Sequence, residues 1–175
     1  LTLEQRANDA MAVINAVTKD SVMVIGFSDG GYTAYQLGAM FPNRIKKMVV
    51  MGAGELYPGL RAFNFTAKQA IDLDKAYWEQ QLKLMPEPER LEEMFAQVAN
   101  CYNKARVGKA LLGTIKCPVL VLAGDHDQGN TVEHVVNAAR MIPKHQISII
   151  PNTTHTVFLE NFAAVWASIE PFLRR

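Results

Sequence analysis

The chain has 175 residues, of which 49% are hydrophobic and 20% are charged, and its formal net charge is +1. These values are typical of a globular domain that is long enough to bury a core. The near-neutral net charge gives no support for a nucleic-acid or acidic-membrane partner, because no basic stripe is available to neutralise phosphates. No apolar run approaches the roughly 20 residues that a membrane-spanning helix needs. We therefore expect neither nucleic acid nor a membrane as a partner.

Segments with helical periodicity alternate with short, continuously apolar segments over most of the chain. Such apolar segments are typical of strands that are buried on both faces of a parallel sheet. The expected elements are, in chain order, a helix at 3–18, a strand at 21–26, a helix at 29–41, a strand at 45–51, a strand at 118–124, a helix at 131–142, a strand at 146–150 and a helix at 157–173. This order predicts an α/β fold with a four-stranded parallel sheet, flanking helices and right-handed crossovers.

The middle of the chain interrupts this alternation. Residues 55–113 contain no clear strand, but they contain two long helical patterns, at 66–85 and 88–105, and many aromatic side chains. We interpret residues 55–113 as a helical lid that is inserted into a core formed by residues 1–54 and 114–175.

The sequence GFSDG at residues 26–30 lies between the first predicted strand and the helix that follows it. It matches G-x-S-x-G, in which a strained turn lifts a serine hydroxyl above the end of the sheet. Ser28 would then be a nucleophile, and the backbone N–H of Asp29 would face the developing oxyanion at a helix N-terminus. The neighbouring glycines would be required because a Cβ would clash with the tight backbone. The alternative is a glycine-rich loop in which Ser28 only caps the helix.

A serine nucleophile needs a histidine base that is oriented by a carboxylate. The strand at 118–124 is followed by Asp125, His126 and Asp127, and the strand at 146–150 is followed by a loop that reaches His155. Ser, acid and His in this chain order, each after a strand, form the α/β-hydrolase pattern. We favour Asp127 as the acid. Asp125 is the competing candidate, although its position next to the strand favours hydrogen bonding within the turn.

Three segments together resemble the C-terminal two-thirds of an α/β-hydrolase-fold protein: VIGFSDGGYTAYQLGAMFPNRIKKMVVMGA, KCPVLVLAGDHD and IIPNTTHTVFLENFAAVWASIEPFL. The Ser-Asp-Gly-Gly turn resembles the branch of small esterases and peptidases that includes valacyclovir hydrolase-like and prolyl iminopeptidase-like enzymes. The resemblance implies that Ser28 is the nucleophile, Asp127 the acid and His155 the base, that the 55–113 insertion is the lid, and that no metal or organic cofactor is needed. It also implies that the first four strands, the first helix and one oxyanion-hole donor are absent. Because the loss of one donor typically costs about 10²–10³ in kcat, we expect weak activity from this fragment.

Candidate substrate contacts surround the proposed nucleophile. The Asp29 carboxylate is expected either to recognise a cationic group, such as a free α-amine, or to be a structural carboxylate that the helix N-terminus stabilises. Phe27, Tyr57 and Trp78 are candidate apolar contacts for the substrate, although aromatic side chains of a lid also serve its packing. His126 has no further His or Cys nearby and is not expected to bind a metal.

The sequence therefore predicts a serine hydrolase that cleaves a small ester or amide through an acyl-enzyme intermediate. Two alternatives remain: a non-hydrolytic ligand receptor with a vestigial triad, and a C–C bond hydrolase or lyase with the same triad. The strand at 22–26 is expected to have an unpaired apolar edge, which predicts self-association or pairing with a missing N-terminal segment. The expected location is the cytoplasm.

Overall fold

The computed structural model describes residues 1–174, which form two compact units. We call Tyr57–Ala105, together with Leu1, the helical unit. We call Thr2–Leu56 and the residues from Arg106 onward the sheet unit. Among residues 1–174, no helix combines the length and the apolar character that crossing a membrane requires.

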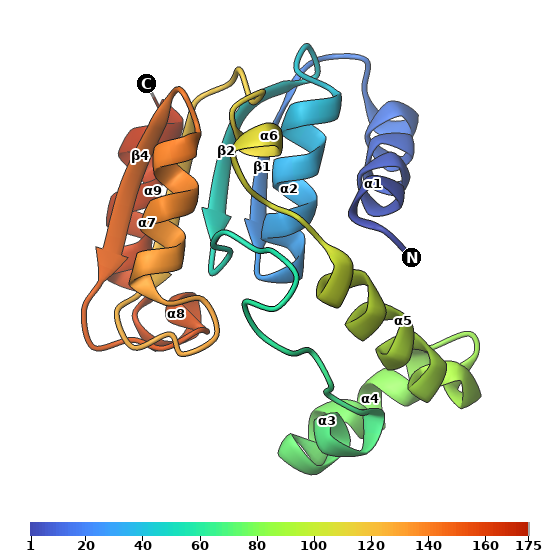
Figure 1. The fold of residues 1–175 in the computed structure, drawn as a ribbon. Coiled ribbons are helices and arrows are strands. Elements are labelled where there is room, and N and C mark those ends of the chain that lie inside the picture. The colour runs from blue at the N-terminus through green and yellow to red at the C-terminus, as the bar shows by residue number, and fades with distance from the viewer. Residues whose placement is uncertain (175) are drawn as a thin grey trace. The chain divides into compact units, whose positions relative to one another are not determined.

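The sheet unit is built on four parallel strands in the spatial order β1-β2-β3-β4. The strands are β1 (Val22–Phe27), β2 (Ile45–Met51), β3 (Val119–Gly124) and β4 (His145–Ile150). Helices α2 (Asp29–Met40) and α7 (Val132–Met141) lie on one face of the sheet, and α9 (Phe162–Arg174) lies on the other (Figure 1). Helix α1 (Leu3–Val17) packs against α2, and the short helices are α6 (Lys109–Leu112) and α8 (Val157–Glu160). The predicted α/β fold with a parallel sheet and flanking helices is confirmed.

The core of the sheet unit is continuous across the central strands. Every residue of β3 is buried, as its uninterrupted apolar sequence predicts. Under α9 the core includes Val49, Leu120, Leu122 and Ile169. Each such side chain contributes about 1.5–3 kcal/mol when it is fully buried. This packing holds the carboxyl ends of the strands in place, and the loops that follow β1, β3 and β4 carry Ser28, Asp127 and His155.

The helical unit contains α3 (Ala67–Leu73), α4 (Lys75–Leu84), the 3₁₀ helix η1 (Pro88–Arg90) and α5 (Leu91–Lys104). The prediction of a single helix at 66–85 is wrong, because the structure has two helices there, which are divided at Asp74. The Asp74 carboxylate accepts a hydrogen bond from the backbone N–H of Tyr77, 2.9 Å away, and thereby caps α4.

The helix predicted at 157–173 is divided in the same way. Helix α8 ends at Glu160 and α9 begins at Phe162. Between them, the Asn161 side chain accepts a hydrogen bond from the backbone N–H of Ala164 at 3.2 Å. Both wrong predictions have one cause. The helical spacing of apolar residues continues past Asp74 and Asn161, but the side chains of these two residues accept hydrogen bonds from nearby backbone N–H groups, and a new helix begins there.

Strand β1 lies at an edge of the sheet and leaves apolar side chains exposed. It pairs with β2 on one side, and Met23 and Ile25 are 43% and 53% exposed. The sequence of β1, VMVIGF, carries no charge that would discourage pairing with another strand.

We expect the chain to self-associate through β1, and we expect Ile25→Lys to shift it towards the monomer. A lysine on an edge strand opposes strand addition because pairing would bring like charges together. Sedimentation velocity over a range of protein concentrations measures the effect. Val17→Lys is the matched control, because Val17 is 81% exposed but lies at the end of α1. A wild-type chain that stays monomeric at every concentration would contradict the prediction.

Candidate active site

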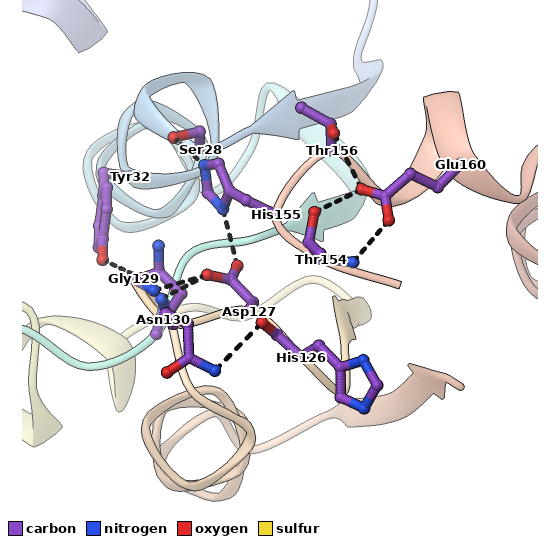
Figure 2. Close-up of polar contacts among 12 residues, drawn as sticks. Ser28, Tyr32, His126, Asp127, Gly129, Asn130, Thr154, His155, Thr156 and Glu160 are labelled. Carbon is purple, nitrogen blue, oxygen red and sulfur yellow. Dashed lines mark hydrogen bonds and ion pairs between the residues drawn. The ribbon is translucent and has the colours of Figure 1, made fainter. Parts of the chain in front are cut away.

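The loops after β1, β3 and β4 bring Ser28, Asp127 and His155 together (Figure 2). His155 Nε2 lies 2.9 Å from Ser28 Oγ, and His155 Nδ1 lies 2.7 Å from Asp127 Oδ2. The carboxyl ends of parallel strands meet at one edge of a sheet, which explains how residues far apart in the sequence converge. All three predicted triad residues thus form one hydrogen-bonded chain.

Asp125, the competing acid, is hydrogen-bonded to the loop after β4, whereas hydrogen bonding within its own turn was expected. Its Oδ1 accepts a hydrogen bond from the backbone N–H of Thr153 at 3.2 Å, and its Oδ2 lies 3.8 Å from His126 Nε2. The contact with Thr153 joins the loop after β3 to the loop after β4. In residues 1–174 no three or more His, Cys, Asp or Glu side chains are grouped so that they could hold a metal ion.

Ser28 has the strained backbone of a nucleophile turn. Its φ of 51° and ψ of −112° are rare for a residue other than glycine, and such backbone costs on the order of 1–3 kcal/mol. The Ser28 side chain does not cap α2, although the residue occupies the N-cap position. The alternative of a capping serine is therefore wrong, since the hydroxyl faces His155 instead.

The glycines of the motif differ in how strictly they are needed. A Cβ on Gly26 would lie 2.3 Å from the carbonyl oxygen of Gly30, and one on Gly31 would lie 2.8 Å from the Ala53 Cβ. A Cβ on Gly30 would meet no heavy atom of the described residues within 4 Å. The expectation that both flanking glycines are required is thus right for Gly26 and wrong for Gly30. Gly31, outside the five-residue motif, is the second crowded position.

The Asp127 carboxylate is almost fully buried and well hydrogen-bonded. Its exposed fraction is 2%, and Oδ1 accepts from the backbone N–H groups of Gly129 at 2.9 Å and Asn130 at 2.8 Å. Burial is the largest influence and raises the pKa of Asp127. The hydrogen bonds from His155, Asn130 and Gly129, with the charge of His155, together outweigh it and hold that pKa below its ordinary value. An ionised Asp127 accepts from His155 Nδ1–H, which leaves Nε2 to accept from Ser28.

Asn130 connects the loop that carries Asp127 to other parts of the sheet unit. Its side-chain oxygen accepts from the Tyr32 hydroxyl at 2.7 Å and from the backbone N–H of Gly54 at 3.0 Å. These partners lie on α2 and after β2, and both Asn130 and Tyr32 are buried. Sequence reasoning missed Asn130, and the available signal was its position three residues after Asp127, where an Asx turn closes.

Phe27 and Gly52 lie against the His155 ring. The Phe27 ring centroid lies 4.9 Å from that of His155 and 4.9 Å from that of Phe158. Gly52, at a φ of 61°, lies so close that a Cβ there would be 3.0 Å from His155 Cε1. Phe27, predicted as a substrate contact, is therefore also a packing partner of the imidazole.

Glu160, on α8, holds both neighbours of His155 (Figure 2). Its carboxylate accepts from the backbone N–H of Thr154 at 2.8 Å, from the Thr154 hydroxyl at 2.6 Å and from the Thr156 hydroxyl at 2.9 Å. The hydrogen bonds from Thr154, above all, hold the pKa of Glu160 below its ordinary value. Sequence reasoning missed this residue because no motif or strand end marks it.

We expect Glu160→Gln to lower the melting temperature near neutral pH and to lose this effect in acid. A lowered pKa in the folded chain means that the ionised carboxylate stabilises the fold above its ordinary pKa, about 4.3. This stabilisation disappears as the pH falls through the lowered value, because both states then bind the proton. Thermal melts between neutral and strongly acidic pH measure the difference, with Glu79→Gln, on the exposed side of α4, as the control. A difference in melting temperature between wild type and Glu160→Gln that stays constant at every pH would contradict stabilisation by the ionised Glu160 carboxylate.

Tyr57 and Trp78, the other predicted substrate contacts, belong to the helical unit. Tyr57 is 47% exposed. The Trp78 ring packs with those of Tyr77 and Phe95, at centroid distances of 5.5 and 5.7 Å. The contacts of Tyr57 and Trp78 with substrate stay predictions.

Asp29, directly after Ser28, forms an ion pair with Arg6 of α1 through Arg6 Nη1 and Asp29 Oδ2. The Asp29 side chain is half-exposed and that of Arg6 is mostly buried. Sequence reasoning missed Arg6, since nothing in the periodicity of α1 distinguishes one charged position from another.

Comparisons with known proteins agree with this fold. The Alpha/beta hydrolase family model matches residues 1–168. A curated relative, the serine hydrolase BPHL of Mus musculus, is 24% identical over 181 residues, which cover 98% of this chain and 61% of that protein. This chain thus spans less than two-thirds of that relative.

Solved structures show the same fold at low sequence identity. The enol-lactonase from Burkholderia xenovorans LB400 has a TM-score of 0.78 and 19% identity, and the match covers 100% of this chain and 74% of that one. A meta-cleavage product hydrolase from Pseudomonas fluorescens IP01 has a TM-score of 0.80 and 15% identity, and the match covers 99% and 72%. Because the family match extends over nearly all of the sequence and the sheet has the expected parallel order, this chain belongs to the alpha/beta hydrolase family.

Proposed function

We propose that this chain carries the catalytic core of a serine hydrolase that cleaves a small ester or amide through an acyl-enzyme intermediate. The observation that carries the proposal is the hydrogen-bonded chain from Ser28 Oγ to His155 at 2.9 Å and from His155 to Asp127 at 2.7 Å. Nucleophile, base and orienting acid are the three groups that this chemistry needs within hydrogen-bonding distance.

In the first step, Ser28 Oγ attacks the substrate carbonyl carbon while His155 Nε2 takes the hydroxyl proton. Asp127 accepts from His155 Nδ1–H and stabilises the imidazolium. The tetrahedral oxyanion faces the N-terminus of α2, where the backbone N–H of Asp29 would donate. His155 then gives the proton to the leaving alcohol or amine. In the second step, water adds to the acyl group with His155 as base, and the carboxylic acid product leaves Ser28 with its hydroxyl restored.

The remaining parts of the proposal concern the substrate. Residues 55–113 would act as a lid that excludes water during the reaction, with Tyr57 and Trp78 offering apolar contacts. A preference for substrates with a free amino group was predicted from the Asp29 carboxylate. In this chain the Asp29 carboxylate forms an ion pair with Arg6.

Labelling with a fluorophosphonate tests the proposal. We expect one adduct per chain, on Ser28, and turnover of p-nitrophenyl acetate; both should be lost in Ser28→Ala. Ser148→Ala is the control, because Ser148 is hydrogen-bonded to Ser168 at 2.8 Å on the other edge of the sheet. A chain that binds an ester or amide but is not labelled at Ser28 by the fluorophosphonate would favour a non-hydrolytic receptor instead. Labelling without turnover of any ester or amide would favour a C–C bond hydrolase or lyase.

A further inference from the structure

Arg6 and Asp29 place an ion pair directly beside the proposed nucleophile. Asp29 is the first residue of α2, and Arg6 reaches it from α1. The Arg6 side chain is 20% exposed, and its Nε is buried with no hydrogen-bond partner among the described residues. A buried donor without a partner costs free energy, so the guanidinium occupies this position although its hydrogen bonding is incomplete.

The electrostatic role of this pair follows from its position. The N-terminus of α2 offers a positive potential to an oxyanion that forms at Ser28. A lone carboxylate at Asp29 would oppose this potential, because a second negative charge develops next to it during attack. The Arg6 guanidinium cancels that charge, so the helix terminus keeps its positive character.

The same pair has a consequence for substrate choice. An unpaired carboxylate next to the nucleophile would attract a cationic acyl group, such as one with an α-ammonium. In this chain that carboxylate already has a cationic partner. We propose that Arg6 is a specificity-determining residue, which withholds the Asp29 carboxylate from cationic substrates and makes the site select neutral acyl groups. The proposal rests on the proposed hydrolase function.

The test compares two esters that differ by one charge. L-Alanine benzyl ester carries an α-ammonium, and benzyl 2-methylpropanoate has a methyl group in its place. Their dissociation constants are measured in the Ser28→Ala background, at a pH where the amine is protonated. Binding in this background does not depend on turnover, so a failure of the hydrolase proposal, seen as absent labelling of Ser28, is distinct from a failure of this one.

A double-mutant cycle isolates the ion pair. Arg6→Met is expected to raise the affinity for the cationic ester relative to the neutral one about threefold to tenfold, the range of a partly exposed charge pair. Asp29→Asn leaves Arg6 without this charge partner. It is expected to lower the affinity for the cationic ester relative to the neutral one. The double variant Arg6→Met/Asp29→Asn should return to within about twofold of the original ratio, and Arg6→Lys should preserve it.

A purely structural ion pair would give a different result. In that case Arg6→Met would lower the melting temperature and weaken the binding of both esters equally, so their affinity ratio would not change. This result would overturn the proposal. Absence of binding of either ester to the Ser28→Ala protein would overturn it as well. If Arg6→Met does not fold, the affinity ratio of the Ser28→Ala protein itself decides, because the proposal requires it to bind the neutral ester more tightly than the cationic one; tighter binding of the cationic ester would overturn the proposal.

Discussion

Asp127→Asn is expected to lower the rate of Ser28 acylation about 10⁴-fold, whereas Asp125→Asn should leave it within about threefold. The two residues lie two positions apart, yet only Asp127 contacts His155 Nδ1. An asparagine in place of Asp127 can present its NH₂ group to Nδ1, which would make Nδ1 an acceptor and leave the proton on Nε2. His155 could then no longer accept the Ser28 proton, although its ring would stay in place.

The rate of fluorophosphonate labelling measures this effect, and circular dichroism shows whether each variant is folded. In the Asp127→Asn variant the side chain keeps an oxygen that can accept from the backbone of Gly129 and Asn130, so the turn should survive. Equal losses in the two variants would mean that the acid has been assigned to the wrong aspartate.

Gly26→Ala is expected to prevent the formation of the nucleophile turn, while Gly30→Ala should be tolerated. The new Cβ at position 26 would lie 2.3 Å from the Gly30 carbonyl oxygen and 2.7 Å from its carbonyl carbon. These are backbone atoms at the start of α2, so no rotamer change relieves the overlap. We expect a cost of about 3–5 kcal/mol or more, which is a large part of the roughly 5–15 kcal/mol that stabilises a typical domain.

Gly30→Ala supplies the matched comparison within the same motif. Its Cβ has open space, and alanine is more favourable than glycine in a helix by about 0.5–1 kcal/mol. We therefore expect an unchanged or slightly raised melting temperature and continued labelling of Ser28. The prediction fails if Gly26→Ala has the same melting temperature as the wild type, or if Gly30→Ala is unfolded.

The sequence predicts the sheet and the triad well because both depend on patterns that run along the chain. The strands are continuous apolar segments, and β3 is buried at every residue. Ser28, Asp127 and His155 each follow a strand, and the parallel arrangement brings strand ends together without further information.

The features that the sequence does not predict depend on contacts between elements or on local competition. Asp74 and Asn161 end apolar patterns that continue past them, since capping is decided by one side chain and not by a period. Glu160 and Arg6 act on partners that only the folded chain brings near. Gly30 belongs to the motif, but the crowding that requires glycine lies at Gly26.

The triad also has a mechanical consequence for the protein. Ser28 follows β1 and His155 follows β4, which are the two outer strands of the sheet, with β2 and β3 between them. The loop after β4 therefore carries His155 back over the ends of β3 and β2: the backbone N–H of His126 donates to the carbonyl of Thr153 at 2.9 Å, and a Cβ on Gly52 would lie 3.0 Å from His155 Cε1. Outer strands have a neighbour on one side only, so they open more readily than central ones. We therefore expect the 2.9 Å contact between Ser28 Oγ and His155 Nε2 to be lost when either outer strand opens.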